Sequence, residues 1–187
     1  HYASHPFKEK LELINKDIYK AEDTVLKYDI IIIRDVIEHI HDQDKFLSMI
    51  RKFTHEESVV FVGFPPWQNP FGGHQQMSKN KLLSILPYFH LLPEKAYAGV
   101  LKLFGESVDT IDGLLEIKQT GISIERFKNI AEKNYRIREE ELFLINPNYE
   151  VKFGLKPRRI WKWIGGIPYL RNYLITCGYY LLKINQP

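Results

Sequence analysis

The chain has 187 residues, of which 44% are hydrophobic and 26% are charged, as in a globular domain of ordinary size. Its formal net charge of +3 is too small to indicate a nucleic-acid-binding protein, and its single cysteine, Cys177, excludes an intramolecular disulfide and a cysteine-based zinc site. No stretch reads as a secretory signal or reaches the roughly 20 apolar residues of a spanning helix, so we expect a cytoplasmic protein without a nucleic-acid partner.

The first predicted element is a short strand at residues 11–14, where apolar and polar side chains alternate. Asp17 and Ile18 follow it. By residue type alone, Asp17 fits an Asx turn that closes the strand.

The most informative stretch covers residues 28–42 and reads YDIIIIRDVIEHIHD. Its four consecutive isoleucines predict a strand buried on both faces, as in a parallel sheet. Charged and imidazole side chains crowd the residues that follow, and open α/β sheets build their sites from such groups at the carboxyl ends of strands. The alternative is a surface loop whose charges are solvated. The side chains concerned are Arg34, Asp35, Glu38, His39, His41 and Asp42.

This stretch resembles the fourth strand and following turn of class I S-adenosylmethionine-dependent methyltransferases. Residues 61–76, FVGFPPWQNPFGGHQQ, resemble the fifth strand and substrate loop of the same superfamily. The resemblance covers residues 11–76 and, more loosely, residues 124–153. It implies a Rossmann-like α/β sheet, S-adenosylmethionine as the cofactor, and transfer of a methyl group to a hydroxyl of a small molecule.

The resemblance also assigns cofactor-binding residues. In the family, the third strand ends in an acidic residue that accepts a hydrogen bond from the adenine amino group. Asp17 matches that position, with Ile18 beside the adenine ring, although the Asx turn stays open as an alternative. Arg34 and Asp35 would line the methionine part of the cofactor.

One part of the family pattern has no counterpart here. Residues 1–10 cannot supply the family's first strand and glycine-rich loop, and no GxGxG occurs in the chain. In that fold the first strand lies beside the fourth, so without it the isoleucines would form an open apolar edge. We therefore expect the chain to be the C-terminal part of a longer protein, with an N-terminal piece or a swapped partner segment completing the sheet. We expect this chain alone to bind the cofactor poorly.

The central elements follow from local patterns. Asp42 or Asp44 is expected to cap a helix that runs to about residue 53, and residues 58–64 predict a buried strand. Three prolines and two glycines in residues 65–74 exclude regular structure. This loop either walls a pocket with Trp67, Phe71 and His74 or is only a proline-rich connection.

Residues 77–122 predict a helical insertion, which resembles the substrate-selecting lids of methyltransferases. Residues 124–131 predict a helix capped by Ser123. Residues 135–145 and 149–153 predict two strands of an antiparallel hairpin, joined by the turn-forming residues 146–148, that would close the family's sheet.

The end of the chain is basic and aromatic. After Glu150 there are seven lysines and arginines and no acidic residue. Pro168 predicts the first turn of an apolar helix that runs through Leu182. We expect this helix to dock on its own domain, on a second subunit as a homodimer contact, or on a membrane surface. The chain is thus divided into a partial methyltransferase domain at residues 1–153 and a C-terminal extension at 154–187.

The candidate chemistry rests on the pattern D-x-x-E-H formed by Asp35, Glu38 and His39. On a helix these positions share one face, and His74 could join them as a fourth ligand of a divalent cation such as Mg²⁺. The pattern resembles the E-x-x-E-H of the metal-dependent small-RNA 2′-O-methyltransferases and of the ubiquinone-pathway O-methyltransferases, with Asp35 in place of the first glutamate.

The candidate catalytic residues are His39, His74 and Glu38. A bound cation would lower the pKa of the substrate hydroxyl; without one, either histidine could be the general base. Alternatively, Glu38 caps a helix and His39 packs under the loop. Two other functions stay open: a non-catalytic methyltransferase-like interaction module, and a nucleotide-sugar or NAD enzyme, which the lack of a glycine-rich loop weighs against.

Overall fold

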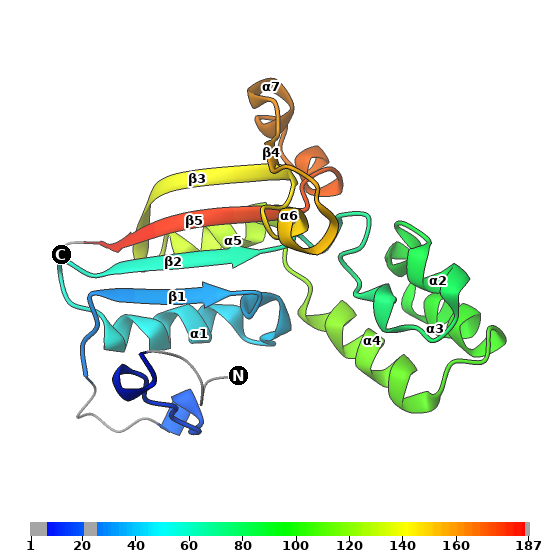
Figure 1. Ribbon diagram of the computed structural model, residues 1–187, viewed down its shortest axis with the longest axis horizontal. Helices are drawn as coiled ribbons and strands as arrows, with labels where there is room; N and C mark the ends of the chain where they lie inside the picture. The colour runs from blue at the N-terminus through cyan, green and yellow to red at the C-terminus, as the bar shows by residue number, and fades with distance from the viewer. Residues whose placement is uncertain (1–6, 21–25, 186–187) are drawn as a thin grey trace.

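A five-stranded mixed sheet forms the centre of the protein (Figure 1), in a computed structural model that describes residues 7–20 and 26–185. In spatial order the strands are β1 (Ile30–Arg34), β2 (Val59–Phe64), β5 (Cys177–Ile184), β3 (Tyr135–Ile145) and β4 (Arg158–Arg159). Strands β1 and β2 are parallel, whereas β5 runs antiparallel to both of its neighbours, β2 and β3. The protein therefore has a mixed α/β fold, as predicted.

Two amphipathic helices pack on one face of this sheet and enclose the main core. They are α1 (Gln43–Ile50), which the short turn η5 (Arg51–Phe53) extends, and α5 (Ile124–Ala131). The side chain of Asp42 accepts a hydrogen bond from the Lys45 backbone at 3.0 Å, and Ser123 caps α5 in the same way. Both predicted helices are confirmed, because each has a cap residue followed by apolar residues at helical spacing.

Strand β1 is present and pairs in parallel with β2, but the expectation that it is buried on both faces is wrong. Ile33 is buried in the core, whereas Ile30 and Ile32 are 66% and 69% exposed. The reason is that β1 lies at the edge of the sheet and that α1 and α5 cover only one face. Side chains alternate between the two faces of a strand, so every second isoleucine faces outward.

The predicted helical insertion forms a separate small cluster beyond the carboxyl ends of β1 and β2 (Figure 1). Its own apolar core includes Leu83, Phe89, Tyr97, Leu101 and Leu114. Its elements are η6 (Gln75–Met77), α2 (Lys81–Ile85), η7 (Phe89–Leu91), α3 (Glu94–Leu103) and α4 (Val108–Thr120).

Three predictions about the end of the chain are wrong. Residues 149–153 belong to a short helix, α6 (Asn148–Phe153), and not to a hairpin strand. The expected apolar helix from Pro168 to Leu182 is replaced by the turn η8 (Leu170–Tyr173) and strand β5, and the short helix α7 (Lys162–Gly165) precedes them. Strand β3 consequently pairs with β5, at the centre of the sheet, and on its other side with the short strand β4.

The physical reason lies in the environment of β5. Strand β5 carries apolar and aromatic side chains on both of its faces, and that composition is also typical of a buried helix. Tyr180 and Leu182 face the core, while Tyr179 packs on the opposite face against Phe61 and Phe143. In the described part of the chain, no helix has the length and apolar character needed to cross a bilayer.

The predicted strand at residues 11–14 is also wrong. Residues 11–15 have no regular secondary structure, and their side chains are exposed, including Leu13 at 70%. Two short turns, η2 (Lys8–Lys10) and η3 (Ile18–Lys20), flank this segment. An alternating pattern forms a strand only where a neighbouring strand accepts its backbone hydrogen bonds.

Candidate functional site

The exit of β1 is a sharp turn built on a residue in the left-handed region. Asp35 has φ 52°, and its backbone N–H donates to the Gly63 carbonyl at 2.8 Å, which ties the turn to the end of β2. A non-glycine residue at positive φ is uncommon, and such residues cluster at functional sites. The Arg34 guanidinium lies 3.7 Å from the Asp35 carboxylate and 6.0 Å from the centre of the Tyr179 ring.

Glu38 is the buried carboxylate of this turn. It is 5% exposed, and its Oε2 atom has no hydrogen-bond partner within the described residues. Burial raises the pKa of Glu38 to about 7, with a smaller contribution in the same direction from the Asp35 charge, against the lowering effect of a backbone hydrogen bond. The carboxyl group is therefore poised to exchange a proton near neutral pH.

The structure does not form the helix that was expected to align D-x-x-E-H on one face. Residues Ile37–His39 form the single 3₁₀ turn η4, and Asp35 lies before it in a different backbone conformation. The alternative in which Glu38 caps a helix end is not realised either, because the cap of α1 is the side chain of Asp42.

His39 and His74 meet at this edge although they follow different strands. Their rings stack with centroids 5.0 Å apart and planes 19° apart. His74 itself has φ 50°, so the loop after β2 is held in a tight left-handed bend that directs it to the β1 exit. Burial lowers the pKa of His74, His39 lowers it further, and Asp35 opposes both. At neutral pH this imidazole is neutral and able to accept a proton.

The two stacked rings do not by themselves form a metal site. The lone pairs of an imidazole lie in its ring plane, and nearly parallel planes do not converge on one ion. Across residues 7–20 and 26–185, no three or more His, Cys, Asp or Glu side chains are placed so that they could hold a metal ion together. The divalent cation stays a prediction of the sequence.

The loop at residues 65–74 is fixed to the helical insertion. The Trp67 backbone N–H donates to the Ile122 carbonyl at 2.8 Å, and the Trp67 carbonyl lies 2.7 Å from Nε2 of His90. A Cβ atom added at Gly73 would lie 2.2 Å from Cβ of His90, so glycine is required there. Trp67 also packs edge-on against the His90 ring at 4.7 Å. The loop is therefore held against the helical insertion by hydrogen bonds and close packing.

His90 was not identified from the sequence. It is fully buried, and its Nδ1 atom has no hydrogen-bond partner among the described residues. Burial lowers its pKa to about 4, against the effect of its hydrogen bond to Trp67. The Lys118 ammonium donates to the His90 carbonyl at 2.8 Å and lies over the Trp67 ring at 5.4 Å. His90 and Lys118 together connect the loop at Trp67 to helix α4.

The start of β5 supplies two further residues that the sequence did not reveal. Since β5 is antiparallel to β2, its first residues lie at the same edge as the ends of β1 and β2. Burial raises the pKa of the Cys177 thiol to about 12, the Asp35 charge raises it further, and Arg34 opposes this. Tyr179 lies beside Arg34. No motif marks these residues, and only the placement of β5 brings them here.

Asp17 adopts the Asx-turn arrangement. Its side chain accepts a hydrogen bond from the Tyr19 backbone at 2.9 Å, and its carbonyl accepts one from the Lys20 backbone. Ile18 packs against the main core, and the Lys45 ammonium lies over the Tyr19 ring at 5.2 Å. The segment therefore lies against the first turn of α1, the helix that follows Glu38 and His39. The adenine-binding role of Asp17 and Ile18 stays a prediction.

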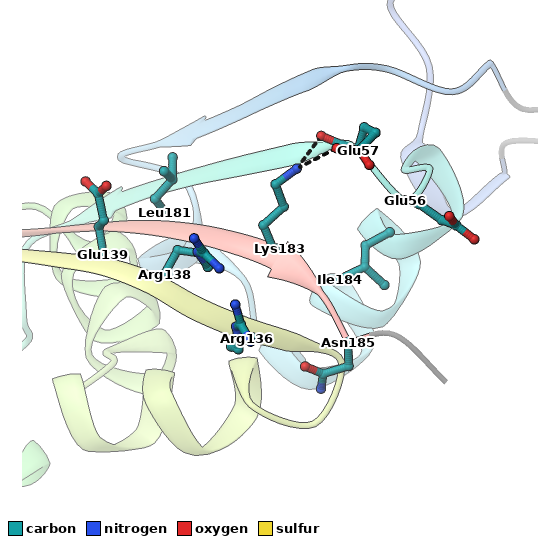
Figure 2. A pocket seen from close by; sticks show the side chains of 9 residues that line it. All are labelled: Glu56, Glu57, Arg136, Arg138, Glu139, Leu181, Lys183, Ile184 and Asn185. Atoms are coloured by element: carbon teal, nitrogen blue, oxygen red, sulfur yellow. Dashed lines mark hydrogen bonds and ion pairs between the residues drawn. The ribbon is translucent and has the colours of Figure 1, made fainter.

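A shallow groove of about 670 Å³ lies at the opposite end of β2 and β5 (Figure 2). Arg136, Arg138 and Lys183 line it together with three glutamates, so its charges are mixed. The Lys183 ammonium donates to the Glu57 carbonyl at 2.6 Å and faces the Glu57 carboxylate at 3.6 Å. This groove has no part in the candidate site.

Comparison with protein-family models and with curated proteins found no match to this chain.

Proposed function

We propose that the protein is an S-adenosylmethionine-dependent O-methyltransferase that acts on a hydroxyl of a small molecule. The observation that carries the proposal is the stacking of His39 on His74 at the carboxyl ends of two adjacent parallel strands, with the buried Glu38 next to His39 in the same turn. Ligands of open α/β sheets bind at this edge. The resemblance of residues 28–42 and 61–76 to the methyltransferase superfamily supports the same reading.

The arrangement of the sheet is a second, fold-level support. The sheet of that superfamily is closed by an antiparallel hairpin, and here the antiparallel pair β3 and β5 occupies the side of β2 away from β1. The helical insertion extends beyond the carboxyl ends of β1 and β2 (Figure 1), where a lid over a substrate would lie.

The proposed chemistry is an in-line displacement. When S-adenosylmethionine is bound, it supplies the methyl group, and the bond between sulfur and methyl carbon breaks as the hydroxyl oxygen bonds to that carbon. The residues of the chain have to align the hydroxyl and remove its proton. His74 suits the second task because its lowered pKa leaves it neutral at working pH. His39 stacks against it and orients the ring.

Glu38 and Asp35 have supporting roles in this proposal. Glu38, with a pKa of about 7, can take up the proton or hold it on the way to solvent. Asp35, in its left-handed turn, and Arg34 beside it are the residues proposed to face the methionine part of the cofactor.

The test is calorimetric titration of S-adenosylmethionine into the full-length gene product. Binding at sub-millimolar ligand that Asp35→Asn weakens would support the proposal. Methyl transfer to a hydroxyl-bearing substrate should then be lost in His74→Ala, and assays in chelator, with and without added Mg²⁺, separate a base mechanism from a metal-assisted one. Absence of binding would reject the proposal.

Such a result would favour the second candidate, a non-catalytic interaction module. The specific observation behind that candidate is the outer edge of β1, where Ile30 and Ile32 face solvent beside backbone groups with no strand partner in the described part of the chain. An open, apolar strand edge is a surface on which another chain can pair.

A further inference from the structure

Residues 161–170, here called the aromatic arm, hold large apolar side chains in solvent. Trp163 is 71% exposed, Tyr169 69% and Trp161 65%, and Ile167 and Leu170 are exposed as well. Figure 1 shows α7, which lies in this arm, projecting beyond the end of β4 and away from the sheet. Single exposed apolar residues are ordinary, but a contiguous group of this size marks an interaction surface.

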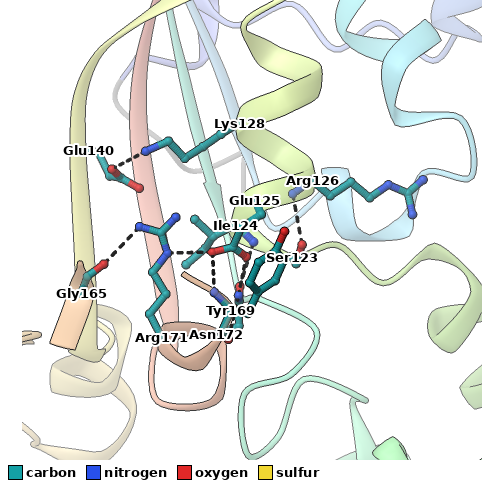
Figure 3. Close-up of polar contacts among 10 residues, drawn as sticks. All are labelled: Ser123, Ile124, Glu125, Arg126, Lys128, Glu140, Gly165, Tyr169, Arg171 and Asn172. Atoms are coloured by element: carbon teal, nitrogen blue, oxygen red, sulfur yellow. Dashed lines mark hydrogen bonds and ion pairs between the residues drawn. The ribbon is translucent and has the colours of Figure 1, made fainter. Parts of the chain in front are cut away.

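The aromatic arm is held in place by specific hydrogen bonds and an ion pair. The Arg171 side chain, 11% exposed, donates to the Gly165 carbonyl at 3.1 Å and to the Glu125 carboxylate at 3.0 Å (Figure 3). Glu125 also accepts hydrogen bonds from the Tyr169 backbone at 2.9 Å and from the Asn172 side chain at 2.6 Å. The ion pair thus fixes the middle of the arm at Gly165 and its C-terminal end at Tyr169, while the aromatic side chains stay exposed.

Arg159 and Arg171 are paired with Glu141 and Glu125, and the unpaired side-chain charges along the arm and its approach are positive. Lys156, Arg158 and Lys162 are exposed, and within the described residues none of them has an ion-pair partner. The chain contains no aspartate or glutamate beyond Glu150 to neutralise them. The arm and its approach therefore combine indole rings, aliphatic side chains and free cations.

We propose that the aromatic arm docks on the surface of an anionic phospholipid bilayer. Trp161, Trp163 and Tyr169 would sit at the level of the headgroups, where amphipathic aromatic rings are most stable, and the neighbouring cations would face the negative lipids. The exposed Ile167 and Leu170 favour a bilayer over RNA, since RNA offers stacking and phosphate contacts but no hydrocarbon. This proposal goes beyond methyl transfer and does not depend on it.

The test is flotation of the full-length gene product with two kinds of vesicle. One kind is phosphatidylcholine alone, and the other contains about one part phosphatidylserine to three parts phosphatidylcholine, so that its surface is negative. We expect binding to the anionic vesicles, weakened by high salt, and little binding to the neutral ones. Lipids brominated near the headgroup should quench the fluorescence of the arm's tryptophans.

Two variants separate the contributions of charge and of the aromatic rings. The triple variant Lys156→Gln, Arg158→Gln, Lys162→Gln should bind anionic vesicles about 100-fold more weakly, because each such cation contributes about 1 kcal/mol near an anionic surface. The double variant Trp161→Ala, Trp163→Ala should lose about tenfold or more in affinity and should lose the quenching.

Matched controls come from the helical insertion. Leu103 and Val108 are 82% and 71% exposed, so Leu103→Ala, Val108→Ala removes similarly exposed apolar side chains elsewhere. Lys81→Gln, Lys95→Gln, Lys102→Gln removes three exposed cations from α2 and α3. Both controls should bind vesicles like the wild type. Equal binding to both vesicle types, equal losses in the controls, or tryptophan-dependent binding to single-stranded RNA without vesicle binding would overturn the proposal.

Discussion

The imidazole rings of His39 and His74 stack with their centroids 5.0 Å apart, which joins the turn after β1 to the loop after β2. Two groups that become positive on protonation oppose each other's charge at this distance. His39 therefore lowers the pKa of His74, in addition to the larger effect of burial, while the Asp35 carboxylate opposes both.

The titration of His74 should respond to each neighbour in a defined direction. His39→Asn removes a competing positive charge, so the pKa of His74 should rise towards its ordinary value. Asp35→Asn removes a stabilising negative charge, so the pKa should fall further. NMR titration of the His74 ring signals measures both shifts. His41→Asn, which changes an exposed histidine of the same segment, should leave the titration unchanged.

Glu38 should make the protein less stable as the pH rises. Its folded-state pKa of about 7 lies above the ordinary value of 4.5, so the folded state binds more protons between these values. The free energy of unfolding thus falls as pH rises through that window, by about 3 kcal/mol if the whole pKa difference arises from folding. Glu38→Gln stays neutral and should be more stable than the wild type at pH 8 but not at pH 4, as measured by urea denaturation.

The control for this prediction is Glu116→Gln, which changes an exposed glutamate on α4. Its stability should follow the wild type at every pH. Stability curves of wild type and Glu38→Gln that run parallel from pH 4 to pH 8 would contradict the assignment of a raised pKa to Glu38.

His90 should make the protein less stable as the pH falls, the opposite of the effect of Glu38. Its pKa of about 4 lies below the ordinary 6.5, so the unfolded state binds more protons between these values, and stability is lost as pH falls through the window. The expected contribution is about 3 kcal/mol. His90→Gln keeps an N–H near the position of Nε2 for the Trp67 carbonyl and removes the titration. Denaturation at pH 7 and pH 4.5 should show a smaller acid loss in the variant than in the wild type.

The ion pair of Glu125 and Arg171 should be essential for stability. Their side chains are 17% and 11% exposed, and Glu125→Gln would leave a buried guanidinium without a countercharge. We expect a loss of about 3 kcal/mol in the free energy of unfolding. Glu57→Gln removes an 88% exposed partner of Lys183 and should cost about 0.5 kcal/mol or less. If the two losses are equal, the pair does not hold the aromatic arm.

Local patterns were enough to predict most of the regular structure. Capping by Asp42 and Ser123, the isoleucine strand, the strand at residues 58–64 and the helical insertion all follow from sequence within the element. The proximity of His39 and His74 was also predictable, because parallel neighbouring strands deliver their exit loops to one edge.

The errors arise where an element is defined by distant partners. The residues of β5 are apolar on both sides, which fits a buried helix as well as a central strand, and only pairing with β2 and β3 decides between them. Cys177, Tyr179 and the buried His90 were missed for the same reason. Residues 11–14 alternate like a strand but have no strand beside them, so their pattern has no structural consequence.

The placement of β5 also sets an order for folding. Strands β2 and β3 are not adjacent, and the strand between them comes last among the described elements, more than 100 positions after β2. During synthesis the nascent chain exposes two unjoined sheet fragments until residues 177–184 emerge from the ribosome. Contacts this distant in sequence are slow to form, so we expect pairing of β5 with β2 and β3 to limit the rate of folding.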